Sequence, residues 1–175
     1  MKKAILLSLI LLFVVTVFSQ EDVSKANIYL ELGGAGMLTS INYEQKVWAR
    51  NNNALNLRAG VGYFPLIVNT KMAAGTYSLI VGANFLKNYR NHHIVVGLYN
   101  SFANTFTTRT NRESGNYIFN NLIVPSIGYR YQKTEKGRFF IGVGYSPVIS
   151  FTGFTISNSS MQYKNYFCLY LGFTI

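Results

Sequence analysis

Hydrophobic residues alternate with small or polar residues along most of the chain after its first twenty positions. In the stretch FFIGVGYSPVISF, residues 139–151, large apolar side chains occupy every second position, and Gly, Ser or another small or mid-sized residue occupies most positions between them. Successive side chains of a β-strand point to opposite faces, so this period of two predicts a strand with one bulky face. Neither face carries a charge, whereas the water-facing side of a soluble sheet normally does. We therefore expect the bulky face to contact lipid.

The same alternation recurs in eight segments, none of which shows a helical period. Each has roughly the 9 to 13 residues that a tilted strand uses to cross a hydrocarbon layer. The segments are residues 27–36, 39–48, 54–65, 76–87, 92–104, 121–133, 138–150 and 163–175. An even number of strands returns both ends of a barrel to the same side of a membrane.

The connections between the segments alternate in length. Three are short and rich in Asn, Gly and charge (ARNNN, NYRN and TEKG), a composition that favours tight reversals. Three others, residues 66–75, 105–120 and 151–162, are longer and are predicted to be loops. Outer-membrane barrels show this asymmetry, with short periplasmic turns and longer outward loops. The pattern therefore predicts an all-β, eight-stranded antiparallel up-and-down transmembrane β-barrel.

The two faces of these segments differ in composition. The outward candidates in the third, fourth, sixth and eighth segments, which begin at Leu55, Tyr77, Ile123 and Phe167, include no charged residue. The inward face carries Gly, Asn and Ser with a few charged groups. Eight strands leave an interior only wide enough for side chains, so we expect a closed, filled, polar lumen. A soluble barrel such as a lipocalin would reverse the faces and leave an outer surface almost free of Lys and Glu, which is an unusual composition.

Four charged residues fall on the inward face: Glu31, Glu44, Arg58 and Arg130. If the second and third segments reverse around Asn51, Glu44 lies opposite Arg58. The first hairpin, centred between residues 37 and 38, would place Glu31 opposite Glu44, and two adjacent carboxylates need cations such as Arg58 and Arg130 beside them. A gate or a paired-carboxylate catalytic site is one interpretation. We favour a salt-bridge network that fills and rigidifies the lumen.

Aromatic residues lie toward the segment ends on the apolar face, where the interfacial girdles of membrane barrels are found. The predicted interfacial aromatics are Tyr43, Tyr63, Phe85, Tyr129, Tyr131, Phe139 and Phe151.

Other candidate sites support structural roles. His92 and His93 suggest a serine hydrolase, but Ser101 lies eight residues further on, too far along one strand for contact. The GGAG stretch, residues 33–36, lacks the following helix and Lys-Ser/Thr pair of a phosphate-binding loop, so it predicts bending or close packing of the first hairpin. Cys168 is the only cysteine and suggests no function. We predict no catalytic residue, no cofactor and no metal site.

The beginning of the chain has the order of a secretory signal peptide. Two lysines precede an apolar stretch over residues 4–18, and a cleavage site is expected after Ser19. We therefore predict a signal peptide over residues 1–19 and a barrel domain over residues 20–175; a retained membrane anchor is the alternative. The net charge of the chain is +10, yet no run of basic residues is concentrated anywhere and an exported chain rarely meets nucleic acid, so anionic lipid head groups are the expected partners.

The stretches YLELGGAGMLTSINYEQKV, NLRAGVGYF, PSIGYRYQ, FFIGVGYSPVI and LYLGFTI together resemble the small outer-membrane β-barrel proteins of the OmpA/OmpX-like family. The resemblance covers nearly all of the chain after the signal and implies an eight-stranded barrel with roles in anchoring, adhesion or stress resistance. Such barrels usually end on an aromatic residue that the assembly machinery reads, whereas this chain ends on Ile175, with Phe173 nearby. The family's additional peptidoglycan-binding domain is not expected here.

The sequence thus predicts a non-enzymatic integral barrel in the outer membrane of a Gram-negative-type envelope, with surface loops for structural or interaction roles. The expected partners are outer-membrane lipids, lipopolysaccharide and the barrel-assembly machinery, together with an unidentified surface ligand. A lipid-modifying outer-membrane enzyme and a narrow small-solute channel are the alternatives.

Overall fold

The computed structural model describes residues 26–69, 72–109, 112–133, 138–152 and 160–175. Within these ranges the side chains of residues 66–69, 72–74, 107–109, 112–117, 150–152 and 160–163 lie outside the description. The predicted signal peptide, residues 1–19, also lies outside the described residues.

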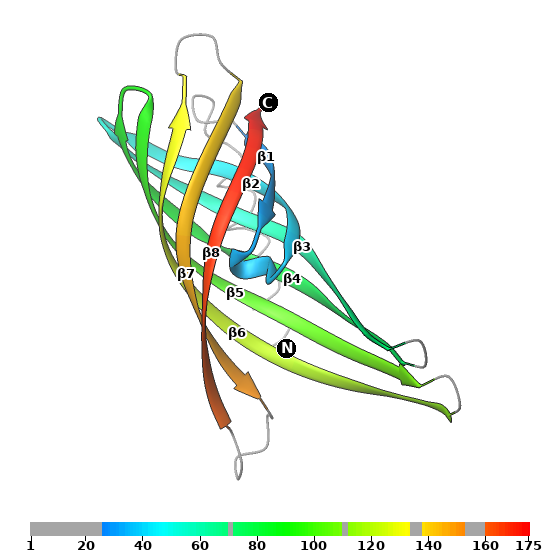
Figure 1. Ribbon diagram of the computed structural model, residues 1–175. Coiled ribbons are helices and arrows are strands. Elements are labelled where there is room, and N and C mark those ends of the chain that lie inside the picture. The colour runs from blue at the N-terminus through cyan, green and yellow to red at the C-terminus, as the bar shows by residue number, and fades with distance from the viewer. Residues whose placement is uncertain (1–25, 70–71, 110–111, 134–137, 153–159) are drawn as a thin grey trace, which may run out of the picture.

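Eight strands form a closed barrel in which every strand pairs with its neighbours in the chain, and β1 pairs with β8 to close the sheet (Figure 1). All pairings are antiparallel, so the predicted eight-stranded up-and-down barrel is confirmed. The strands are β1 (Ala26–Leu32), β2 (Thr39–Arg50), β3 (Asn53–Asn69), β4 (Met72–Tyr89), β5 (His92–Arg109), β6 (Arg112–Gln132), β7 (Phe139–Thr152) and β8 (Ser160–Thr174).

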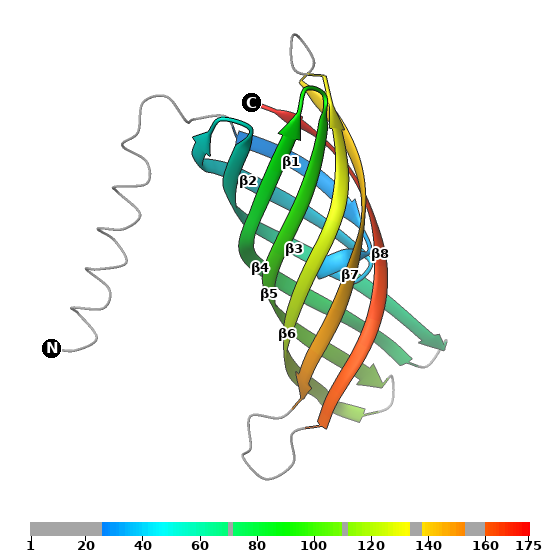
Figure 2. The ribbon, with the colours of Figure 1, turned by 90° about the vertical axis from the view of Figure 1, so that its left-hand side faces the viewer.

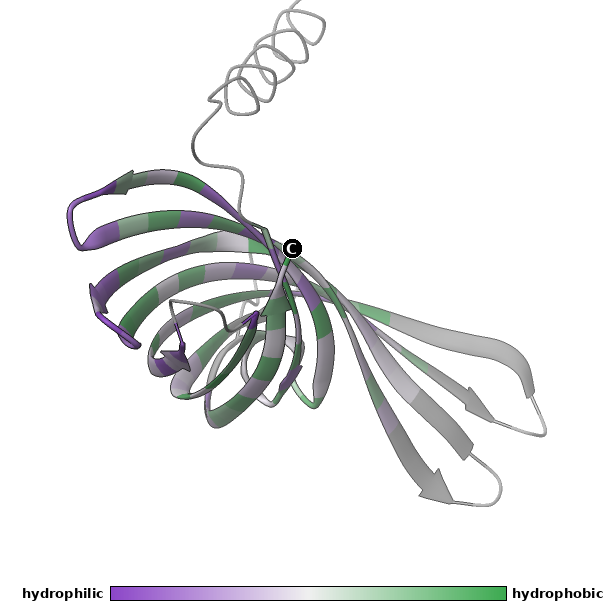
Figure 3. Cartoon of the chain, turned by 90° about the horizontal axis from the view of Figure 1, so that it is seen from above, coloured by the Kyte–Doolittle hydropathy of each residue, from purple (hydrophilic) through white to green (hydrophobic). Residues whose placement is uncertain are grey.

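The alternating sequence pattern produces an inner and an outer face. On β7, Phe139, Ile141 and Val143 are 73%, 48% and 52% exposed, while Phe140 between them is buried. Bands of opposite hydropathy therefore alternate along the strands in the view down the barrel (Figure 3). The bulky face of this strand points outward, as its sequence predicts.

Two of the predicted loops are wrong, because those residues continue the strands. β3 and β4 stay paired as far as Asn69 opposite Met72, and β5 and β6 as far as Arg109 opposite Arg112. Stretches such as LIV and NYIF in these segments are rich in β-branched and aromatic residues that favour strands. The resulting long hairpins lie at the end of the barrel opposite the C-terminus (Figures 1 and 2). Of the third predicted loop, residues 153–159 lie outside the described residues.

The connection between β1 and β2 differs from the other hairpins because it folds into the barrel. β1 ends at Leu32 rather than at Gly36 as predicted, and residues Gly34–Gly36 form a single 3₁₀ turn, η1, which is buried. Gly33 and Gly34 have φ angles of 78° and 65°, in the region that glycine adopts without steric penalty. The chain therefore turns inward at these two glycines. Among the described residues, no helix has the length and hydropathy needed to cross a membrane.

The barrel interior has an apolar layer around η1 and a polar layer beside it. Ala35 of η1 contributes to a cluster of buried side chains from four strands, namely Ile80, Tyr99, Ala103, Leu122, Val124 and Val148. A second cluster contains Tyr29, Phe140, Cys168 and Tyr170. Within the described residues, buried side chains therefore occupy the interior, and one of their layers is apolar rather than polar.

Candidate functional site

Glu44 is the centre of a hydrogen-bonded network inside the barrel. Its carboxylate is fully buried. Oε1 accepts hydrogen bonds from the side-chain amides of Asn27 (2.9 Å) and Asn56 (2.7 Å), and Oε2 accepts one from Asn84 (2.5 Å). Arg130 donates to both oxygens, from Nη1 at 2.9 Å and from Nη2 at 3.2 Å. Glu44 on β2 thus connects to β1, β3, β4 and β6 across the lumen.

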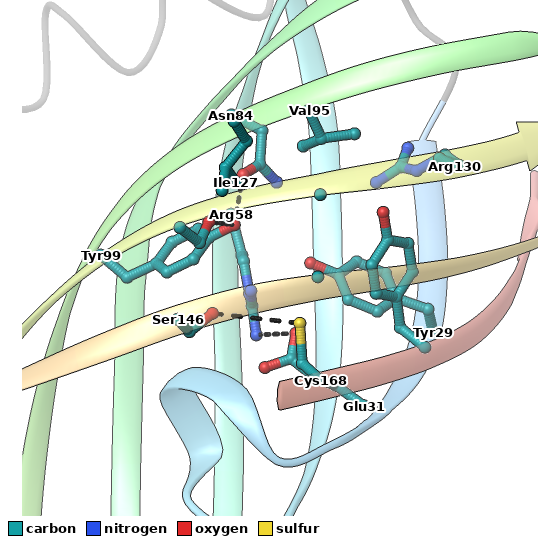
Figure 4. Close-up of a pocket in the computed structure, with 14 residues that line it drawn as sticks. Tyr29, Glu31, Arg58, Asn84, Val95, Tyr99, Ile127, Arg130, Ser146 and Cys168 are labelled. Atoms are coloured by element: carbon teal, nitrogen blue, oxygen red, sulfur yellow. Dashed lines mark hydrogen bonds and ion pairs between the residues drawn. The ribbon is translucent and has the colours of Figure 1, made fainter. Parts of the chain in front are cut away.

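A second buried ion pair joins Arg58 to Glu31. The Nη2 atom of Arg58 lies 2.8 Å from Oε2 of Glu31 (Figure 4). Arg58 also donates from Nε and Nη2 to the side-chain oxygen of Asn42, at 3.0 and 2.8 Å. The other oxygen of Glu31 accepts the backbone N–H of Ala35 at 3.1 Å. Glu31 therefore holds η1 against the charged network.

Both guanidinium groups also lie over aromatic rings. The central carbon of Arg58 is 4.3 Å from the ring centroid of Tyr99, and that of Arg130 is 4.5 Å from the ring centroid of Phe140. Tyr29 and Tyr170 lie slightly further away, at 5.3 Å from Arg58 and 5.5 Å from Arg130. Cation–π attraction is stronger where water is excluded, so these rings stabilise the buried cations.

The strand register agrees with the sequence in one place and differs in another. Glu44 lies opposite Arg58, as expected. Glu31 lies opposite Ser40 and not opposite Glu44, because η1 moves the centre of the first hairpin toward the N-terminus. The ion pairs cross the barrel instead of following the register: Glu44 pairs with Arg130, which reaches over the lumen, and Arg58 pairs with Glu31.

This arrangement leaves little capacity for chemistry at the four charged residues. Each carboxylate is bound by an arginine and by further donors, so neither is positioned as a free general base. A cavity of about 20 Å³ is lined by Glu31, Arg58, Arg130 and Tyr29, among others. Figure 4 shows these residues around it. That volume accommodates roughly one water molecule. The geometry supports a structural role for the network.

Arg58→Ala is expected to lower the melting temperature of the detergent-folded barrel by about 10 °C. The change leaves the Glu31 carboxylate buried without its cation, which costs about 3 kcal/mol in comparable sites. Thermal unfolding followed by circular dichroism measures the effect. Lys164→Ala, at an exposed position of β8, is the control and should leave the melting temperature unchanged. An unchanged melting temperature for Arg58→Ala would contradict a stabilising role.

The candidate histidines and serine do not come together. His92 lies on the outer surface, where its Nδ1 is hydrogen-bonded to the hydroxyl of Tyr129, and His93 points inward with Nδ1 2.7 Å from Oδ1 of Asn88. Ser101 is buried further along β5, opposite Ile80 and Leu122 of the neighbouring strands. The described residues contain no group of three His, Cys, Asp or Glu side chains that could hold a metal ion.

The predicted interfacial aromatics lie on the outer surface. Tyr43, Tyr63, Tyr129 and Tyr131 are each 41% exposed, Phe85 is 42% exposed and Phe139 is 73% exposed. The side chain of Phe151 lies outside the described part of the chain.

The sequence places two further aromatics, Tyr77 and Phe167, on the outward face without naming them among the interfacial aromatics. Tyr77 lies between Tyr63 and Phe106, with ring centroids 4.9 and 5.5 Å away, and Phe167 is 81% exposed. Both Tyr77 and Phe167 have the outward parity of their strands, which is the signal that identifies them.

The fold and its interior define the molecule as a small closed up-and-down β-barrel with an apolar outside and a paired-charge interior. A solved structure, that of Ail, the attachment invasion locus protein of Yersinia pestis, is similar to it with a TM-score of 0.53 and 9% sequence identity. The match covers 87% of this chain and 97% of that protein. It supports the fold that the OmpA/OmpX-like resemblance implies. No protein-family model and no curated protein sequence matches the chain.

Proposed function

We propose that the protein is a non-enzymatic integral β-barrel of the outer membrane, with a closed lumen and a structural or interaction role at the cell surface. The observation that carries this proposal is the outer surface of the barrel. Its described strands expose large apolar side chains such as Leu30, Val61, Leu98 and Ile127, each more than half exposed. A continuous surface of this kind is unfavourable in water and suits hydrocarbon.

The distribution of charge supports the same proposal. The acidic residues whose side chains are described, Glu31 and Glu44, lie inside the barrel. Arg58 and Arg130 neutralise them there, so the network presents no net charge to the lumen. The η1 turn and the apolar layer around it fill the interior beside the network, which favours a closed barrel over a narrow solute channel.

The end of the barrel opposite the C-terminus is the proposed interaction surface. Long hairpins of β3–β4 and β5–β6 project there from a rigid scaffold (Figure 2). Binding residues are often carried on such projecting segments. Attachment appears in the name of the structurally similar protein from Yersinia pestis, and an adhesive role for this surface is consistent with it. Lipopolysaccharide and outer-membrane lipids around the barrel, and the assembly machinery during insertion, are the partners of this proposal.

The outer-membrane assignment is tested by electrophoresis of outer-membrane fractions from Gram-negative cells that express the full chain. We expect unheated samples to migrate differently from boiled samples and to resist protease, because a closed barrel retains its fold in mild detergent. Recovery of the protein in the soluble periplasmic fraction, with identical migration before and after boiling, would overturn the assignment. The boiled sample is the internal control for the unfolded chain.

A further inference from the structure

Positively charged side chains gather at the end of the barrel where the chain terminates. They lie in or beside the three tight connections and are Arg50, Lys87, Arg90, Lys133 and Arg138. Four of them are exposed, and Lys87 is partly exposed. Among the described side chains, this end carries no compensating acid, because Glu31 and Glu44 are sealed in the interior. The described part of this rim is therefore electropositive.

Two of these cations are brought together by the backbone. The N–H of Gln132, at the end of β6, donates to the backbone oxygen of Asn91 in the β4–β5 turn at 2.9 Å. Arg90 and Lys133 each stand one residue from this hydrogen bond, and both are exposed. Within the described residues, no ion pair includes either of them.

An aromatic cluster lies next to this pair on the outer surface. His92, which follows Asn91, lies opposite Tyr131 on β6 with ring centroids 5.4 Å apart. The ring of Tyr129 is 5.9 Å from that of His92, and its hydroxyl is hydrogen-bonded to Nδ1. Because Nδ1 is used in this hydrogen bond, Nε2 is the remaining polar atom of the exposed His92 side chain.

The cluster continues directly into the apolar surface of the barrel. Ile94, two residues beyond His92, is 46% exposed and lies opposite Tyr129. Ile127 is 56% exposed and lies opposite Val96, which is 49% exposed. From the rim inward, the surface of β5 and β6 thus changes from cationic to aromatic and then to aliphatic.

We propose that this surface of β5 and β6 binds a glycerophospholipid with an anionic head group. The phosphate would lie against Arg90 and Lys133, the glycerol region against His92 and Tyr131, and the acyl chains along the aliphatic surface. This order of cationic, aromatic and aliphatic side chains matches the head group, glycerol region and acyl chains of a lipid. A soluble anion would contact the cationic residues alone and leave the aliphatic surface without a partner. A zwitterionic choline head group would place its own cation beside Arg90 and Lys133, and the like charges would repel each other. The inference rests on the proposed membrane location.

The test measures lipid binding to the folded barrel by native mass spectrometry in a non-ionic detergent, with phosphatidylglycerol and phosphatidylcholine as the probes. The protein is purified from membranes of cells that express the full chain. We expect phosphatidylglycerol to bind about tenfold more tightly than phosphatidylcholine, since two basic residues near a surface contribute at least this much. The variant Arg90→Asn/Lys133→Gln should lose most of this difference. Asn is used at residue 90 because its φ is 55°, a conformation that Asn tolerates.

A matched variant separates a defined site from diffuse attraction. Arg50→Gln/Lys87→Gln removes the same charge from the same end of the barrel but from its β2–β4 side. We expect it to retain at least half of the preference for phosphatidylglycerol. An equal loss in both double variants would overturn the site. A barrel that shifts on heating but binds the two lipids equally would also overturn it without affecting the proposed function, whereas a protein without a heat shift would remove both proposals.

Discussion

Replacement of Glu44 by Ala is expected to lower the free energy of unfolding of the barrel by about 3–5 kcal/mol, the largest effect of any single change in the lumen. The side chain is fully buried, and its carboxylate accepts hydrogen bonds from three asparagines and from two nitrogens of Arg130. Its removal leaves a buried guanidinium without a counter-charge and three amides without their acceptor. Urea unfolding in detergent micelles, followed by the fluorescence of Trp48, the only tryptophan, measures the loss.

A double-mutant cycle distinguishes the ion pair from simple loss of packing. Arg130→Met alone leaves the Glu44 carboxylate buried and unpaired, so it should also be strongly destabilising. The cycle is closed with the single change Glu44→Gln and the double variant Glu44→Gln/Arg130→Met, which buries no charge at this position. We expect the double variant to be more stable than the sum of the losses of Glu44→Gln and Arg130→Met predicts. Additive losses in the cycle would show that the pair is not coupled. A loss below about 1 kcal/mol for Glu44→Ala would contradict the stabilising role of the network.

The position of Glu44 opposite Arg58 could be predicted from the sequence, but the structure reaches this register in a different way from the one predicted. A reversal centred on Asn51 gives this pair, but Arg50 lies opposite Asn53, so the turn is centred half a residue later. A bulge between Lys46 and Trp48 then shifts the register back by one residue. The bulge changes the phase of the alternation, so that Trp48 is exposed although Glu44, four residues earlier, is buried. The mixed residues between them do not mark where the change occurs.

The first hairpin shows what alternation alone could not predict. The stretch from Gly33 to Gly36 continues the apparent strand pattern, yet it leaves the sheet and enters the lumen. The inward parity of Ile80 and Leu122 is visible in the sequence, but the partner of these side chains, Ala35, comes from a distant segment. Ion-pair partners depend in the same way on reach across the lumen, so Arg130 could be assigned to the interior but not to a particular carboxylate.

The long hairpins were missed because polar residues interrupt their pattern. Residues 105–120 contain Arg, Asn, Glu and Ser, which favour loops when taken one at a time. Pairing between two adjacent strands outweighs these weak preferences, since each residue added to the hairpin extends a ladder that is already formed. The prediction of outward aromatic residues depended only on parity and position, and the six of them whose side chains are described are exposed.

The second large effect is expected at Gly33, where a side chain would be opposed by both conformation and contact. Its φ of 78° and ψ of −156° fall in a region that is essentially restricted to glycine. A Cβ atom would lie 2.1 Å from the backbone oxygen of Phe167 on β8, which cannot move without disturbing the sheet. We expect Gly33→Ala to lower the free energy of unfolding by about 3 kcal/mol, and the urea midpoint measures it.

Met37, at the other end of the same connection, provides the matched control. Its φ of 69° and ψ of −71°, with the N–H of Leu38 donating to the oxygen of Gly36 at 3.0 Å, define a strained γ-turn. Met37→Gly relieves this strain but removes packing against the apolar layer, so its net effect should stay within about 1 kcal/mol. If Gly33→Ala lowers the free energy of unfolding and Met37→Gly changes it little, entry of η1 into the lumen depends on the glycine. Equal stability of Gly33→Ala and the unaltered barrel would mean that the connection can leave the interior at no cost to the fold.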